Sequence, residues 1–185
     1  MFRRRRPALG AVIALALALV ASASAAASEP TRTMRALRGG FVYPAGTACA
    51  FDVAGEPNAK PPSAPAFQSG GFVAETDFSD GTVAYSVRAR GAYVNLETGA
   101  RFEDVDSYTE RDRFDAGTGL IVGGTTGSTT FYFLPGDHGP FGVVQYPGAL
   151  YHIDGTASYT IDANTFATYE FAYSGSITDV CAAIS

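Results

Sequence analysis

Apolar and polar residues alternate along much of the chain after residue 67. The stretch 82–90 shows the pattern most clearly, because every second residue is apolar: Val83, Tyr85, Val87 and Ala89. Polar residues such as Thr82 and Arg88 occupy positions between them. This period of two predicts β-strands that bury one face and expose the other.

Turn signals separate these strands. Asp80-Gly81 and Asp154-Gly155 are dipeptides typical of tight hairpins, and Glu97-Thr98-Gly99 marks a further turn. No ten-residue window after the N-terminal leader sustains a helical period. The chain is therefore expected to fold as a single all-β domain over residues 47–185, an antiparallel barrel or sandwich of about 8–10 short strands.

The N-terminal 27 residues follow a different pattern. A positive cluster, Arg3 to Arg6, precedes an apolar run, Leu9 to Ala21, and small A-x-A sites follow up to Ala27. This order predicts a cleaved secretory signal peptide over residues 1–27 and a secreted, extracellular protein. The apolar run has about 13 residues and a spanning helix needs about 20, so a retained anchor is the lesser alternative. The export route, Sec or twin-arginine, stays open.

Residues 29–40 are polar and have no regular period, so we expect a flexible N-terminal arm over residues 28–46, with at most a weakly held helical turn. A first strand is expected over residues 47–53. The first cysteine, Cys49, lies within it, and the second, Cys181, lies close to the C-terminus. In an oxidising compartment such a pair predicts a disulfide. Joining the first and last strands in this way favours a closed or nearly closed barrel. The pair lacks the short C-x-x-C spacing of a redox or metal site.

Removal of the leader changes the charge. The chain has 13 basic and 18 acidic residues, and the leader holds four arginines and no acid, so the mature net charge is −9. This charge repels phosphate groups, so nucleic acid is excluded as a partner. No membrane span is expected after cleavage.

Candidate chemistry is sparse. The segment 101–115 holds six acids and three arginines; an acidic-substrate or cation site fits it, but a solvated strand pair is the favoured interpretation. His138 lies in a glycine-flanked turn, and His152 is expected to be half-buried and hydrogen-bonded. Ser128 follows Gly127 but opens a strand and lacks the nucleophile elbow of a hydrolase. We therefore predict no catalytic residue, no metal site and no cofactor.

Two classes of function remain. The 13 Phe and 10 Tyr residues favour a binding module for an extracellular protein, peptide or glycan, because tyrosine combines a flat apolar ring with a polar tip. The alternative is a small cyclase- or isomerase-like barrel enzyme with an internal pocket of Tyr151, His152, Tyr159 and Glu170. A structural protein of the cell envelope is a third hypothesis.

Several short motifs carry a resemblance. They are the Arg- and Ala-rich leader, Cys49-Ala50-Phe51-Asp52-Val53, Asp80-Gly81, Val94-Asn95-Leu96-Glu97-Thr98-Gly99 and Asp179-Val180-Cys181. Together they resemble a group of small secreted β-rich actinobacterial proteins with a paired N- and C-terminal cysteine. The resemblance spans nearly the whole mature chain and supplies no activity or catalytic residue.

Overall fold

The computed structural model describes residues 29–37, 40–57 and 71–185. The expected leader and the start of the arm lie outside these ranges. Nearly all regular structure is antiparallel strand, which confirms the all-β prediction. The elements are β1 (Thr31–Leu37), β2 (Phe41–Tyr43), β3 (Val53–Pro57), β4 (Gly71–Asp77), β5 (Thr82–Asn95), β6 (Arg101–Asp115), β7 (Leu120–Phe133), β8 (His138–Gly139), β9 (Gly142–Val143), β10 (Ala149–Asp162), β11 (Thr168–Asp179) and α1 (Val180–Ala183).

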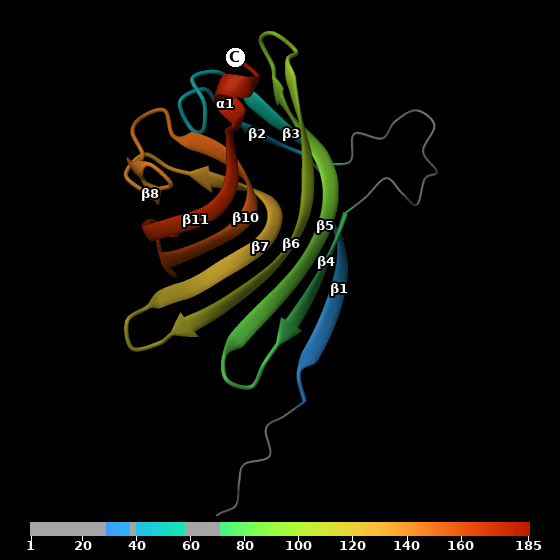
Figure 1. The fold of residues 1–185 in the computed structure, drawn as a ribbon, viewed down its shortest axis with the longest axis vertical. Coiled ribbons are helices and arrows are strands. Elements are labelled where there is room, and N and C mark those ends of the chain that lie inside the picture. The colour runs from blue at the N-terminus through green and yellow to red at the C-terminus, as the bar shows by residue number, and fades with distance from the viewer. Residues whose placement is uncertain (1–28, 38–39, 58–70) are drawn as a thin grey trace, which may run out of the picture.

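Nine of these strands form one sheet in the order β1-β4-β5-β6-β7-β10-β11, with β3 on β5 and β2 on β3. The long strands curve together around one interior, and α1 lies at the same end as β2 and β3 (Figure 1). Among the described strands β1 and β11 do not pair with each other, so the sheet is not a closed barrel. The expectation of closure is wrong because the two edges never meet.

Three glycines in register form a row across the sheet where the strands bend. Gly127 of β7 pairs with Gly155 of β10, and Gly155 pairs with Gly175 of β11. Their φ angles are 123°, 153° and 119°. A Cβ at any of them would strike a backbone carbonyl oxygen of the neighbouring strand. Glycine is therefore required along this row, and such kinks curve a sheet. Asp154-Gly155 thus lies inside one long strand and is not the hairpin that the sequence predicted.

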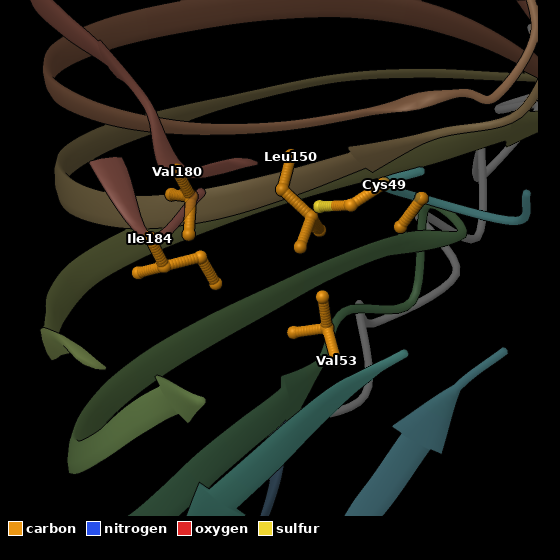
Figure 2. Close-up of a cluster of buried hydrophobic side chains, with 6 residues drawn as sticks. Cys49, Val53, Leu150, Val180 and Ile184 are labelled. Carbon is orange, nitrogen blue, oxygen red and sulfur yellow. The ribbon is translucent and has the colours of Figure 1, made fainter. Parts of the chain in front are cut away.

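A dry hydrophobic cluster closes one end of the sheet. Its six buried members come from the β2–β3 connection, β3, β10, α1 and the residue that follows α1 (Figure 2). They are Ala48, Cys49, Val53, Leu150, Val180 and Ile184, each at most 1% exposed. We call these residues the end cluster. Burial of this apolar surface is the dominant stabilising contribution at this end of the molecule.

The disulfide ties the end cluster together. Cys49 and Cys181 are bonded, with Cα atoms 5.5 Å apart and a sequence separation of 132. The predicted bond is confirmed, but it does not bring the first and last strands side by side. Cys49 lies in the connection before β3, and Cys181 lies in α1.

Two segments differ from their predicted structure. Residues 47–53 were expected to be a strand, but 45–51 form turns and bends and β3 begins only at Val53. The apolar residues there fill the end cluster instead of alternating along a sheet. Residues 31–37, placed in the expected arm, form β1 along the edge of β4. Six of its seven residues are exposed, so β1 is held by backbone pairing. Its sequence has no alternation of buried and exposed residues from which a strand could be predicted.

Candidate functional site

The most unusual surface of the molecule follows one face of β6. Asp106, Tyr108, Glu110 and Asp112 are alternate residues of this strand, so their side chains share one face. All four are partly buried. The favoured interpretation of segment 101–115 as a solvated strand pair is wrong for this face.

Cross-strand register extends this face over the sheet. Tyr108 pairs with Val87 of β5, and Glu110 pairs with Thr125 of β7, which in turn pairs with the buried Ala157 of β10. We call this side of the sheet the inner face. The opposite, outer face carries exposed residues such as Arg88.

Tyr159 crosses the inner face to reach two of the carboxylates. Its hydroxyl group contacts Glu110 Oε1 and lies 2.8 Å from Asp112 Oδ1. Tyr159 can reach Asp112 because the residue between them in register is Gly123. A Cβ at this position would strike both Asp112 and the Tyr159 ring. A tyrosine hydroxyl has one proton to donate. Both contacts are therefore hydrogen bonds only when one carboxyl group of the pair is protonated.

Burial governs the protonation of this face. It raises the pKa of Glu110 and of Asp112, and the charge of Asp112 adds to the rise for Glu110. Burial, followed by the charge of Asp104, raises the pKa of Asp106 from 3.8 to about 6. Asp106 Oδ1 is buried and has no hydrogen-bond partner. Asp106 therefore changes protonation at about pH 6, and Glu110 and Asp112 keep their protons to a higher pH than an exposed carboxyl group does.

A groove of about 400 Å³ opens over these groups. Within the described chain, no arginine, lysine or histidine forms an ion pair with Asp106, Glu110 or Asp112. Arg35 reaches the groove but pairs with Glu75 at 3.5 Å. The groove is lined by carboxylates, tyrosine rings and apolar side chains, together with one arginine. The lining residues are Arg35, Leu37, Val73, Tyr85, Val87, Asp106, Tyr108, Glu110 and Asp112.

A second polar network lies where β6 separates from β7. Regular pairing of these strands ends at Ser107 and Ser128, so Asp104 lies beyond it and reaches toward β10. His152 Nδ1 is 3.1 Å from Asp104 Oδ1, and His152 Nε2 is 3.0 Å from Ser128 Oγ. Thr130 donates its hydroxyl proton to Asp104 at 2.9 Å. Both imidazole nitrogens thus have partners, and His152 is half-buried and hydrogen-bonded as the sequence predicted.

The four residues of the predicted internal pocket do not converge. Tyr151 packs between Phe133 and Phe141 on the aromatic side of β10. His152 lies on the opposite face, in the network with Ser128 and Asp104.

Tyr159 and Glu170 share a different pocket. Tyr159 is buried on the inner face, and Glu170 is exposed and accepts a hydrogen bond from Thr160 at 3.1 Å. Both line a shallow pocket of about 390 Å³, to which neither Tyr151 nor His152 contributes.

The sequence offered segment 101–115 as a cation site only as the less favoured interpretation, and it did not single out Asp106, Glu110 and Asp112. Their signal was present as three acids at alternate positions of one strand, but alternation alone does not say which face is buried. In the ranges that the structure describes, no three His, Cys, Asp or Glu side chains are placed to hold a metal ion.

Comparison with protein-family models, with curated proteins and with solved structures finds no match to the chain. Across the described residues, no helix is both long enough and apolar enough to cross a bilayer. The groove and the network are therefore the features from which a function can be inferred.

Proposed function

We propose that this protein is a secreted binding module that takes a lysine or arginine side chain of an extracellular peptide into the inner-face groove. One observation carries the proposal. Asp106, Glu110 and Asp112 all line this groove, and no basic side chain of the described residues pairs with them. Buried carboxylates ordinarily have a partner, and a cation supplied by a ligand would be one.

The chemistry of the groove suits such a side chain. Tyr85 and Tyr108 present aromatic rings beside the carboxylates. Aromatic faces attract ammonium and guanidinium groups, and aliphatic stems pack against short apolar walls such as Val73 and Val87. The predicted mature charge of −9 would also speed the approach of a cationic peptide.

Secretion belongs to the same proposal. The leader pattern at residues 1–27 predicts export, and the Cys49–Cys181 disulfide supports an oxidising destination. An extracellular peptide or protein segment is then the partner that the groove would meet.

A titration with short peptides tests the proposal. The chain has no tryptophan, so intrinsic fluorescence reports tyrosines, including Tyr85 and Tyr108 in the groove. Trilysine and triarginine at pH 7.5 are expected to give saturable changes, whereas triglutamate and neutral oligosaccharides give none. Raised salt weakens the binding, because screening reduces charge attraction.

Matched variants separate the groove from general charge. Glu110→Gln removes a groove carboxylate, and Glu103→Gln makes the same change on β6 at a side chain that is 70% exposed. We expect Glu110→Gln to weaken peptide binding tenfold or more and Glu103→Gln to change it less than twofold. Equal effects of the two variants, or saturable binding of the oligosaccharides alone, would contradict the proposal.

A further inference from the structure

Ser128, His152 and Asp104 come from three strands and meet in one continuous chain of contacts. Ser128 Oγ is 3.0 Å from His152 Nε2, and His152 Nδ1 is 3.1 Å from Asp104 Oδ1. We propose that these residues form a nucleophile, a general base and an orienting acid, which hydrolyse small carboxylic esters at Ser128. The inference does not depend on the groove, because Ser128 lies on the outer face.

We assign the direction of proton transfer from the partners of His152 Nδ1, which are Asp104 Oδ1 at 3.1 Å and Thr130 Oγ1 at 3.0 Å. Asp104 Oδ1 is an acceptor, so we assign the imidazole proton to Nδ1, which donates to it. Thr130 also donates to Asp104, at 2.9 Å, and holds the carboxylate in place. Nε2 is then the free base that accepts the hydroxyl proton of Ser128. This is the arrangement of groups that activates a serine in hydrolases on unrelated folds.

The strands hold this geometry rigidly. Ser128 pairs with Asp154, and Thr130 pairs with His152, so Ser128 and His152 are diagonal neighbours on adjacent strands. The His152 ring also packs against Phe102, with ring centroids 5.4 Å apart. The side chains of Asp104 and His152 are only 10% and 15% exposed. Base and acid are therefore shielded, and Ser128 remains partly exposed.

A cation lies in the same cross-strand row. Ser128 pairs in register with Ser107, and Ser107 pairs with Arg88, so the three side chains share the outer face. Arg88 Nη1 donates to Ser107 Oγ at 3.0 Å. The guanidinium group and the Ser107 hydroxyl are thus the donors available to the negative oxygen that forms when a serine attacks a carbonyl group.

The proposed reaction balances with water as the second substrate. Ser128 Oγ bonds to the ester carbonyl carbon as its proton passes to His152 Nε2. The bond to the alcohol oxygen then breaks, and His152 returns the proton to the departing alcohol. Water attacks the acyl-serine, gives its proton to His152, and releases the carboxylic acid as Ser128 regains a proton.

Covalent labelling provides the test. Diisopropyl fluorophosphate reacts with an activated serine: the Oγ–P bond forms, fluoride leaves, and the serine proton passes to His152. We expect mass spectrometry of the folded, disulfide-bonded protein to find one adduct, on Ser128. Ser128→Ala removes it, and Ser158→Ala, at an exposed serine of β10, leaves it unchanged.

The role of the base is tested separately. His152→Gln is expected to slow both labelling and the hydrolysis of p-nitrophenyl acetate at least a hundredfold, in the range of general-base catalysis. Asp104→Asn, which conserves shape, serves if His152→Gln does not fold. No adduct on Ser128, or an undiminished rate in a folded variant of His152 or Asp104, overturns the inference. Ser128→Ala changes neither a groove residue nor a charge, so this variant should bind trilysine as the unchanged protein does, and the two proposals fail separately.

Discussion

The two halves of the curved sheet bury different kinds of side chain. The end cluster buries Cys49, Val53 and Leu150 in a dry interior held by a disulfide. On the inner face, the other half buries Tyr159 and partly buries Asp106 and Glu110. Burial of apolar groups stabilises the fold, whereas burial of carboxylates destabilises it unless they are paired. The comparison teaches that stability is concentrated at one end and that the other end retains groups which oppose folding.

Tyrosine shows the same difference. At the apolar end Tyr43 stacks on Tyr132, with centroids 4.6 Å apart, and acts as a packing residue. On the inner face Tyr159 carries its hydroxyl to two carboxylates. Abundant tyrosine therefore does not by itself identify a binding surface, because the surroundings of each ring decide its role.

The largest effect is expected at the disulfide. Replacing both Cys49 and Cys181 with Ala frees a loop of 132 residues and should lower the free energy of unfolding by roughly 4–5 kcal/mol. Urea unfolding followed by circular dichroism measures this change. A loss below about 1 kcal/mol would show that the end cluster does not need its covalent link, and the comparison would lose its strongest contrast.

Packing within the end cluster comes next. Leu150 has no exposed surface, so Leu150→Ala should cost about 2–5 kcal/mol through the cavity it leaves. Val122→Ala is the matched control, because 54% of Val122 is exposed, and it should cost about 0.5 kcal/mol or less. Similar losses for the two variants would contradict the assignment of stability to this end.

On the inner face, removal of a carboxyl group is expected to increase stability. The pKa of Asp106 is raised from 3.8 to about 6, so the folded state binds its proton more tightly than the unfolded state. Asp106 therefore increases the free energy of unfolding below about pH 4, and this contribution is lost as the pH rises through about 6. Asp106→Asn should add roughly 1–3 kcal/mol at pH 7.5 and flatten this pH dependence. A destabilised variant at pH 7.5 is the contrary result in urea unfolding.

The smallest expected effect concerns the contact that spans β7. In Gly123→Ala the new Cβ would meet Asp112 and the Tyr159 ring, and Tyr159 would move away from the carboxylates. We expect a loss of about 1 kcal/mol in stability and several-fold weaker trilysine binding. Gly117→Ala is the control, since its Cβ would meet only Asp115, at 3.3 Å. Unchanged binding in Gly123→Ala would show that this contact does not shape the groove.

Most of the fold could be predicted from local sequence patterns. Alternation over residues 82–90 and the turn at Asp80-Gly81 predicted the β4–β5 hairpin, which the structure confirms. Asp154-Gly155 was wrongly predicted as a hairpin, because a glycine with a positive φ gives the same sequence signal in a turn and in a kinked strand. Edge strand β1 carried no signal, because backbone pairing holds it without apolar alternation.

The candidate site was harder to predict for a different reason. Asp104, Ser128 and His152 are brought together by the point at which β6 leaves β7, and no short motif encodes that separation. His152 was predicted as half-buried and hydrogen-bonded from its strand position, which is a local property. Its partners come from other strands, and the cross-strand register selects them.

The titration of Asp106 tests most directly whether this protein keeps unpaired carboxyl groups for a cationic ligand. Carboxyl-carbon NMR resolves that residue in the free protein and in the presence of trilysine. The account predicts a pKa of about 6 for the free protein and a lower pKa with the peptide bound, because a cation favours the ionised form. A pKa near 4 in the free protein, or a pKa that trilysine leaves unchanged at saturation, would contradict it.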